Sequence, residues 1–492
     1  MKYNWRWVLI VLLLGFSTNQ MFAQNNPELP SIKTQSKPQH LPNQFIGTFT
    51  GKLSILQGGK ELNNNNTSMQ LSIYPANNAS AYNYTIVYTS KFTKDVRAYL
   101  LTVTDSAKGL ATLDERNGIS IPVSIIANKI ISNFTLNQKD QITMIVSFSK
   151  LMAQMELYYG NENSISKINP INKVSPSDPD IIVDSKRITT YQSATLIRET
   201  EPTVSRGNLI QFGYIPSQFT NAHRVAVWLP KDYQPAQNYA VIYMHDGQML
   251  FDSNSTWNHQ EWGIDELITK TNRKAIVVGV WNDGINRSGD YFPQKVWDKY
   301  LSQNDKDSIL KFIGGKNTLF GPIGAQSDNY LKFLTTELKP LIDSTFRPGT
   351  DAAHTYIAGA SMGGLISAYA ICEYPEIFGT AICLSTHWPG TSHFRYPNTP
   401  VALQQYISEH LPNPKNHKIF FAHGTGYLDS LYTQHQLNVD KIMSKKGYKA
   451  NVNWKTIVYL KADHKESEWQ KQMVDALNFT MPVPPNKKQK SK

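Results

Sequence analysis

The stretch that decides the fold is Thr355-Tyr356-Ile357-Ala358-Gly359-Ala360-Ser361-Met362-Gly363-Gly364-Leu365-Ile366. It begins with a short apolar run typical of a buried strand, and it ends by opening an amphipathic helix predicted over Met362–Glu373. The G-x-S-x-G pattern between them has the strand–turn–helix setting of a nucleophile elbow. The stretch therefore predicts Ser361 as a nucleophile at the carboxyl edge of a sheet, beside a helix N-terminus that favours developing negative charge.

Strand-like runs alternate with helical patterns throughout the region beyond Gly207. This alternation predicts an α/β layer fold, with a mostly parallel sheet and helices on both faces. The expected strands are Gly207–Tyr214, His223–Leu229, Tyr239–Met244, Ala275–Val280, Thr355–Ala358, Thr380–Leu384, Lys418–Ala422 and Lys455–Leu460, and Asn329–Ser344 is a further expected helix.

The region before residue 160 contains successive short runs rich in Val, Ile, Thr, Tyr and Phe, which predict an all-β barrel or sandwich. The expected strands are Phe45–Ile55, Met69–Tyr74, Tyr82–Tyr88, Val96–Thr104, Ile119–Ile125, Ile130–Leu136, Gln141–Phe148 and Met152–Tyr158. The opening residues Phe45–Gly51 resemble the first strand of lipocalin-like barrels. Acidic residues such as Asp95, Asp114 and Glu115 are expected at turns and on the surface.

A change of composition separates the two regions. Residues 161–205 carry scattered Asn, Pro and charged residues without periodicity, which is typical of a linker. The chain of 492 residues is therefore expected to comprise a signal peptide (1–23), a β-domain (40–160), this linker, an α/β domain (206–480) and a basic tail (481–492).

The N-terminus has the pattern of a cleaved secretion signal. Basic residues precede an apolar run from Val8 to Phe16, which is too short for the roughly 20 residues that span a bilayer. Cleavage is expected after Ala23, giving an exported protein, periplasmic or secreted, without a membrane span. The two cysteines, Cys372 and Cys383, are expected to be buried apolar residues rather than a bridge.

The net charge of +11 would ordinarily suggest nucleic acid as a partner. However, the two terminal segments hold six basic residues and no acid, and therefore more than half of this excess. The interpretation as a nucleic-acid-binding protein loses most of its support.

A serine nucleophile needs a histidine base oriented by a carboxylate, and in this fold the chain order is serine, acid, histidine. Asp429 and His464 both follow predicted strands at their carboxyl ends, where catalytic groups collect. Asp440 and His435 are weaker candidates because they fall on a predicted helix. His387 and His393 precede any suitable acid.

The second requirement of acyl transfer is a pair of N–H donors for the oxyanion. The loop His245-Asp246-Gly247-Gln248 follows the third strand, so the amides of Gln248 and Met362 are the expected pair. Gly247 would let the backbone approach the substrate, and the side chains of His245 and Asp246 are expected to fix the loop. No metal or phosphate-binding motif is present, so no cofactor is expected.

Four separate segments of the chain together resemble the putative esterase family of α/β hydrolases, which includes esterase D, enterochelin esterases, and feruloyl and acetylxylan esterases. The matching segments are Val225–Pro230, Tyr243–Gln248, Gly359–Leu365 and His464–Trp469. The resemblance implies that Ser361, Asp429 and His464 act as nucleophile, acid and base. It also implies that Arg287, Tyr291 and Trp388 line the substrate pocket, and the stretch Val296–Gln326 is a candidate cap.

The sequence thus predicts an exported serine esterase that hydrolyses carboxylic esters. Acyl esters of polysaccharides and siderophore trilactones are both open as substrates. Two other readings stay open: a catalytically inert binding protein that acts through its β-domain, and an enzyme that transfers the acyl group to an alcohol other than water.

Overall fold

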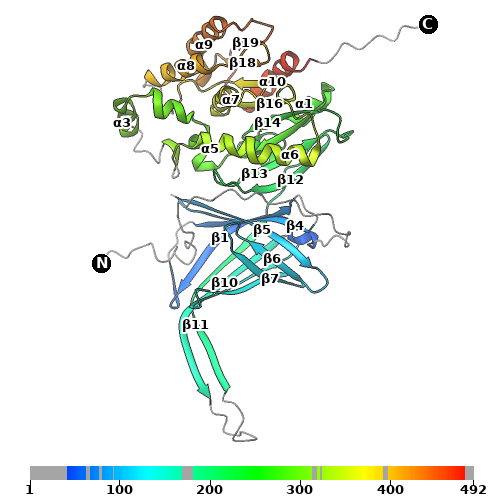
Figure 1. The fold of residues 1–492 in the computed structure, drawn as a ribbon, viewed down its shortest axis with the longest axis vertical. Helices are drawn as coiled ribbons and strands as arrows, with labels where there is room; N and C mark the ends of the chain where they lie inside the picture. The colour runs from blue at the N-terminus through cyan, green and yellow to red at the C-terminus, as the bar shows by residue number, and fades with distance from the viewer. Residues whose placement is uncertain are drawn as a thin grey trace, which may run out of the picture.

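The computed structural model describes residues 41–62, 67–76, 80–91, 93–168, 181–312, 319–321, 324–391 and 397–482, with side chains left out at 162–168, 181–185 and 312. The predicted signal peptide and nearly all of the basic tail lie outside these ranges. Within them, no helix is both long and apolar enough to cross a membrane. The chain forms a β-domain and an α/β domain that stand one above the other (Figure 1).

The β-domain is a closed meander in which each strand pairs with its neighbours in the chain and the last strand, β11, also pairs with β1. Closure removes the unpaired edges that an open sheet would expose. Its strands are β1 (Gly47–Gln57), β3 (Ser68–Pro75), β4 (Ala81–Thr89), β5 (Lys94–Asp105), β6 (Leu110–Asp114), β7 (Ser120–Ile126), β8 (Lys129–Leu136), β9 (Asp140–Phe148), β10 (Met152–Ile168) and β11 (Ile181–Arg198), with the short β2 (Lys60–Glu61) beside β1.

The predicted linker over residues 161–205 is wrong for most of its length. β10 continues to Ile168, and β11 returns from Ile181 as its antiparallel partner, so the two strands form the long arm that leaves the barrel in Figure 1. The second half of β11 then pairs with β1. In the sequence, Asn and Pro residues between positions 161 and 179 interrupt the alternating pattern of the two strands.

One end of the barrel is closed by aromatic side chains. Alternate residues of each strand point inward, and the apolar ones form a single core. The short helix η1 (Asn43–Phe45) places Phe45 inside, where its ring centroid lies 4.4 Å from that of Phe148. Phe49 adds a second contact with Phe148 at 5.6 Å. This packing fills the barrel at the end where β1 begins.

The α/β domain is built on a mixed eight-stranded sheet in the order β12-β13-β15-β14-β16-β17-β18-β19. β13 is antiparallel to both of its neighbours, β12 and β15, and the pairs from β15 to β19 are all parallel, so the carboxyl ends of those parallel strands share one edge. The strands are β12 (Asn208–Ile215), β13 (His223–Leu229), β14 (Ala240–His245), β15 (Ala275–Val280), β16 (Thr355–Ala360), β17 (Thr380–Leu384), β18 (Lys418–Gly424) and β19 (Trp454–Tyr459).

Both faces of this sheet are covered, since alternate residues of a strand belong to different cores. In β14, Val241 and Tyr243 belong to one hydrophobic cluster, whereas Ile242 and Met244 belong to the other. The helices are α1 (Ile264–Lys270), α2 (Arg287–Tyr291), α3 (Gln303–Phe312), α5 (Ser327–Lys332), α6 (Lys339–Phe346), α7 (Met362–Glu373), α8 (Asn398–His410), α9 (Thr433–Lys445) and α10 (Glu466–Thr480), with the π-helical turns η5 (Val296–Tyr300) and η6 (Phe333–Leu338).

The helix α7 was predicted to be amphipathic, and this prediction is wrong. Every residue from Met362 to Cys372 is buried. It packs tightly against β16 and β17, and α2 and α8 also contact it. Cys372 and Cys383 are buried and free, as expected. The helix that carries the candidate nucleophile is therefore fixed from all sides.

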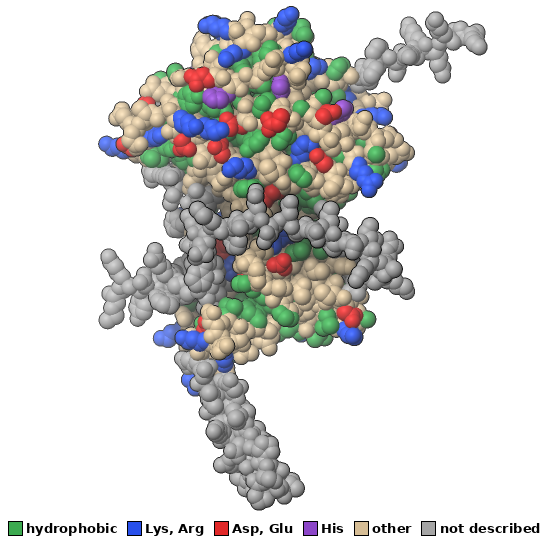
Figure 2. All heavy atoms as spheres, viewed as in Figure 1, with side chains coloured by type: hydrophobic (Ala, Val, Ile, Leu, Met, Phe, Trp, Pro, Cys, Tyr) green, Lys and Arg blue, Asp and Glu red, His purple; other side chains and the backbone are tan. Residues whose placement is uncertain are grey.

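The two domains meet where β12 crosses the outside of β3 and β4. The Asn83 side chain donates to the Phe212 carbonyl oxygen at 3.0 Å, and the Tyr214 hydroxyl donates to Gln70 at 2.8 Å. Lys94 of the barrel forms an ion pair with the buried Asp283 of the α/β domain. Elsewhere, positive and negative side chains are interspersed over the visible face of the upper domain (Figure 2).

Candidate active site

Ser361 occupies the strained turn that the sequence predicts. It follows β16 directly and has φ 60° and ψ −122°, a conformation that a residue with a side chain rarely adopts. Its N–H donates to the Leu384 carbonyl oxygen at 2.9 Å. A Cβ atom on Gly359 would lie 2.6 Å from the carbonyl carbon of Gly363. A glycine is thus required at position 359, because the end of the strand and the first turn of α7 touch each other there.

Asp429 and His464 lie together, although they are far apart in the sequence. The His464 Nδ1 atom lies 2.6 Å from Asp429 Oδ1, and Asp429 is completely buried in the short helix η8 (Tyr427–Leu431). The other carboxylate oxygen accepts hydrogen bonds from the Ser385 hydroxyl at 2.6 Å and the Gly424 N–H at 2.7 Å.

This hydrogen bonding keeps Asp429 ionised despite its burial. Burial raises the pKa of the Asp429 carboxyl, but the bonds from His464, Ser385 and Gly424 outweigh it, so the pKa lies below its ordinary value. An ionised carboxylate accepts the Nδ1–H of His464, which leaves Nε2 as the lone-pair nitrogen of the neutral ring. The ring is held edge-on by Trp469, with 5.0 Å between centroids.

Tyr432 connects the nucleophile to a second histidine, and sequence reasoning did not identify it. Its hydroxyl lies 2.8 Å from His387 Nδ1, and it hydrogen-bonds the Ser361 side chain. Burial raises the pKa of Tyr432, as does the charge of Asp429, while the bond with Ser361 lowers it. The ring centroid of Tyr432 also lies 5.9 Å from that of His464. Both predicted reacting residues therefore touch this tyrosine.

The loop after β14 lies against the first turn of α7, as an oxyanion site requires. A Cβ atom on Gly363 would lie 3.3 Å from an Asp246 carboxylate oxygen. Asp246 accepts two hydrogen bonds from Arg287, at 2.7 and 2.8 Å, and a third from Asn282 at 2.7 Å. Burial raises the pKa of Asp246, but Arg287 holds the net value below the ordinary range.

The reason for a glycine at position 247 differs from the one expected. A Cβ atom there would lie 2.5 Å from the Trp281 ring and 2.8 Å from the backbone of Gly279. Gly247 thus lets the loop pack against β15 rather than against a substrate. Gln248 follows it in the short helix η2 (Gly247–Met249), and its side-chain oxygen accepts from the Asn282 N–H at 3.3 Å.

His245 fixes the structure, as the sequence suggests. It is buried, and its Nδ1 atom lies 2.9 Å from the Tyr330 hydroxyl. Burial lowers the pKa of His245 to about 3, so its ring is neutral at physiological pH.

The three residues predicted to line the substrate pocket are Arg287, Tyr291 and Trp388. Arg287 is engaged by Asp246, and Tyr291 is completely buried, with its hydroxyl accepting from the Asp246 N–H at 3.2 Å. Trp388 is also completely buried and donates from its indole N–H to Gln436 at 2.9 Å. Both aromatic rings are fully buried in this structure. A role in substrate binding stays a prediction.

The weaker candidates belong to other surroundings. Asp440 accepts hydrogen bonds from Gln436 at 2.9 Å and Thr456 at 2.7 Å, and His435 lies near Gln404. Both are on α9, as predicted. His393 falls outside the described residues, as does part of the candidate cap Val296–Gln326. The described part of that stretch packs against α8, for example through the Tyr300 and Tyr406 rings, 5.7 Å apart.

A hollow of about 500 Å³ opens beside His464, with Tyr427, Leu428 and Leu431 as its other lining residues. Tyr427 is 90% exposed. Over the described ranges of the chain, no cluster of three or more His, Cys, Asp or Glu side chains is arranged to hold a metal ion. The site therefore offers a serine, a carboxylate-bound histidine and an open hollow at the histidine.

A family described as "Putative esterase" matches residues 217–480, more than half of the chain. Two uncharacterized proteins of Bacillus subtilis (strain 168) are similar in sequence. YbbA is 25% identical over 34% of this chain and 57% of its own length, and YjcH is 21% identical over 37% and 62%. The chain thus spans less than two thirds of the length of these curated relatives.

Solved structures of serine hydrolases also resemble the chain. An IroE-like serine hydrolase from Shewanella oneidensis is 18% identical, with a TM-score of 0.41 over 55% of this chain and 78% of that one. The feruloyl esterase module from Clostridium thermocellum is 17% identical, with a TM-score of 0.36 over 58% and 92%. Similarity at this level does not transfer the substrates of those proteins to the present chain.

Proposed function

Because the chain belongs to the putative esterase family, we propose that it hydrolyses carboxylic esters through a covalent intermediate on Ser361. The observation that carries this proposal is the 2.6 Å contact between His464 and Asp429 at the same sheet edge as the strained turn of Ser361. A serine at an elbow and a carboxylate-bound histidine are the parts that acyl transfer needs.

The reaction then proceeds in two halves. The Ser361 oxygen attacks the ester carbonyl carbon while His464 Nε2 takes the hydroxyl proton, and the amides of Gln248 and Met362 hold the oxyanion. Collapse of this intermediate breaks the bond to the alcohol, which leaves with the proton from His464. A water molecule gives a proton to His464 and attacks the acyl group, and the acid departs as Ser361 regains its proton.

Asp429 acts throughout as an orienting group. It keeps the proton of neutral His464 on Nδ1 and stabilises the imidazolium that forms in each half. Its own hydrogen bonds from Ser385 and Gly424 fix the carboxylate plane. Arg287 has an analogous positioning role at the oxyanion loop, because it clamps Asp246 with both of its bonds.

Acyl esters of a polysaccharide are the substrate class that the hollow favours. His464 delivers its proton to the leaving alcohol, so the hollow that it lines lies on the alcohol side. The exposed Tyr427 ring there offers a flat apolar face with a polar edge, which suits a sugar ring. A siderophore trilactone is the alternative substrate. Export from the cell is also part of the proposal and rests on the sequence of residues 1–23.

Labelling with a fluorophosphonate probe tests the proposed chemistry. The natural chain should be labelled, Ser361→Ala should not, and its turnover of a small chromogenic ester should fall by about three orders of magnitude or more. Ser367→Ala is the matched control, because Ser367 lies on the same helix with its hydroxyl bonded to the Gly363 carbonyl oxygen at 2.7 Å. Equal labelling of the Ser361 variant would contradict the proposal and point to another reactive serine, and failure of the natural chain to be labelled would favour an inert binding protein.

A panel of esters then separates the substrates. Feruloylated and acetylated xylo-oligosaccharides should be cleaved faster than a catecholate trilactone. Product analysis with an added alcohol acceptor distinguishes hydrolysis from acyl transfer. Preference for the trilactone would overturn the polysaccharide assignment while leaving the esterase assignment intact.

A further inference from the structure

The barrel contains a cavity of about 960 Å³ that is separate from the residues of the ester site. It opens at the end opposite the aromatic closure by Phe45 and Phe148. Residues of the α/β domain form part of its rim, namely Pro216, Ser217, Gln218, Thr220, Asn221, Ala222 and Glu337. The cavity is thus closed at one end and bordered at the other by the second domain.

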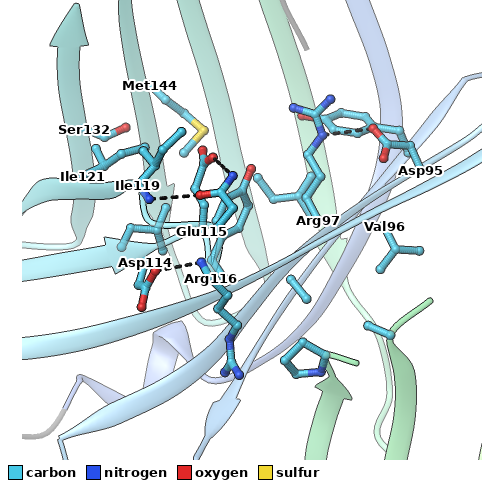
Figure 3. Close-up of a pocket in the computed structure, with 18 of the residues that line it drawn as sticks. Asp95, Val96, Arg97, Asp114, Glu115, Arg116, Ile119, Ile121, Ser132 and Met144 are labelled. Carbon is cyan, nitrogen blue, oxygen red and sulfur yellow. Dashed lines mark hydrogen bonds and ion pairs between the residues drawn. The ribbon is translucent and has the colours of Figure 1, made fainter. Parts of the chain in front are cut away.

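The lining of the cavity combines polar residues with an apolar part. The apolar part is formed by inward-facing side chains from β4 to β10. These residues are Ile86, Leu113, Ile121, Phe134, Ile142, Met144 and Leu157. Two of them, Ile121 and Met144, lie near Ser132 in Figure 3. Apolar walls of this kind favour a ligand whose body is mainly hydrocarbon or aromatic.

The charges of the lining are unbalanced and are concentrated at the rim. Four carboxylates, those of Asp95, Asp114, Glu115 and Glu337, face only two guanidinium groups, Arg97 and Arg116. Arg97 is already paired with Asp95 at 2.9 Å, and the two lie together on one side of the opening in Figure 3. The net negative charge of the rim therefore disfavours an anionic ligand.

The polar groups deeper in the barrel carry no charge. Tyr99 and Ser132 line the cavity. Tyr84 pairs in register with Tyr99, with 6.2 Å between their ring centroids, and Gln192 pairs in register with Leu157, so both stand next to lining residues without being lining residues themselves. Tyr84 and Gln192 are completely buried, and neither the Tyr84 hydroxyl nor the Gln192 amide has a hydrogen-bond partner among the described residues. Buried polar groups without partners are costly unless a bound molecule satisfies them.

We propose that the barrel cavity is a second binding site, which takes an uncharged and mainly apolar molecule carrying hydroxyl or carbonyl groups. The apolar walls bind the body of this molecule, and its hydroxyl or carbonyl groups meet the neutral polar side chains. The acidic rim selects against its carboxylate analogues. The site is independent of Ser361, so binding and ester hydrolysis are separable.

A displacement experiment on the full chain tests the proposed ligand class. The Ser361→Ala variant is titrated with Nile red, an uncharged dye that fluoresces in apolar surroundings, and the dye is then displaced with 1-dodecanol or with dodecanoate. The alcohol should displace the dye, and the carboxylate should bind at least about tenfold more weakly. Failure of the alcohol to displace bound dye, absence of dye binding, or equal binding of the carboxylate would each overturn the proposal.

A pair of variants on one strand places the site inside the barrel. Ser132 is buried and lines the cavity, whereas Thr135 on the same strand is exposed on the outer face. Ser132→Phe should weaken dye binding at least about tenfold, and Thr135→Phe should leave it unchanged. Circular dichroism checks that the barrel is folded, and Ser132→Leu is the milder variant if it is not. Equal dye affinity in the folded Ser132 and Thr135 variants would show that the dye binds elsewhere.

Discussion

The Tyr432 hydroxyl donates its proton to Nδ1 of His387, and this direction follows from the surroundings of the histidine. Nε2 of His387 lies 3.1 Å from the Thr391 carbonyl oxygen, which can only accept, so Nε2 carries the hydrogen. Burial lowers the pKa of His387 to about 4, so the ring is neutral and its Nδ1 accepts from Tyr432. Tyr432 therefore presents a lone pair, not a proton, to Ser361.

Because the Tyr432 hydroxyl donates its proton to His387, we predict only a small loss of activity in Tyr432→Phe. An oxygen that only accepts cannot stabilise an oxyanion, so kcat should fall by less than about tenfold in steady-state assays with a chromogenic ester. Loss of an oxyanion donor would instead cost about a hundredfold or more. A loss of that size would show that Tyr432 donates to the substrate and would reverse the assignment.

Asp429→Asn should be severe, because the amide cannot accept the His464 proton with the same strength and favours the wrong tautomer. We expect kcat to fall by about three to four orders of magnitude. Ser385→Ala removes only one of the hydrogen bonds to Asp429 and should cost about tenfold or less. Comparable losses in the two variants would mean that the network, rather than the carboxylate, holds the histidine.

Arg287→Lys tests whether the clamp on Asp246 positions the oxyanion loop. Lysine keeps the charge but cannot form both bonds, so kcat should fall by about tenfold with a smaller change in KM. Lys270→Met is the control, because it removes an exposed ion pair with Glu266 far from the loop. A change confined to KM would indicate direct contact between Arg287 and the substrate.

The buried histidines should make the fold sensitive to mild acid. The pKa of His387 is about 4 when folded, against about 6.5 in an unfolded chain, so between these values the unfolded state binds more protons. Stability should therefore fall as pH decreases from about 6.5 towards 4, by on the order of 3 kcal/mol for this residue.

Chemical denaturation across that pH window measures the effect. His387→Gln, which has no titrating group, should show a shallower pH dependence than the natural chain, although it is less stable at pH 7. His354→Gln is the control, because His354 lies in a partly exposed turn. An unchanged slope in the His387 variant would show that this ring is not kept neutral in the folded protein.

The strands and the elbow could be predicted because their patterns are local. Val241 to Met244 and Gly359 to Gly363 carry their own signals, and the order of serine, acid and histidine brings Asp429 and His464 to one edge. Tyr432 could not be found in this way. Its hydrogen-bond partners lie 45 and more positions away, and no short sequence pattern predicts a hydrogen bond between the start of a helix and a loop.

Parts of the β-domain could not be predicted for similar reasons. β6 is absent from the predicted strands, because it is only five residues long and its two ends merge with turns. Asp95 and Glu115 are partly exposed, in keeping with the prediction of surface residues, but the sequence does not show that they border a cavity. Whether an inward position faces a packed core or an open space depends on the curvature of the whole barrel, which a single strand does not encode.

Closure of the barrel by β11 determines where the protein can be divided. A fragment that ends at Gly160 retains β1 and β10 but lacks the strand that pairs with both. Each would present a row of unsatisfied N–H and C=O groups, and such edges recruit strands from other molecules. Fragments cut there should accumulate as aggregates, and a soluble β-domain requires the chain to continue past Arg198.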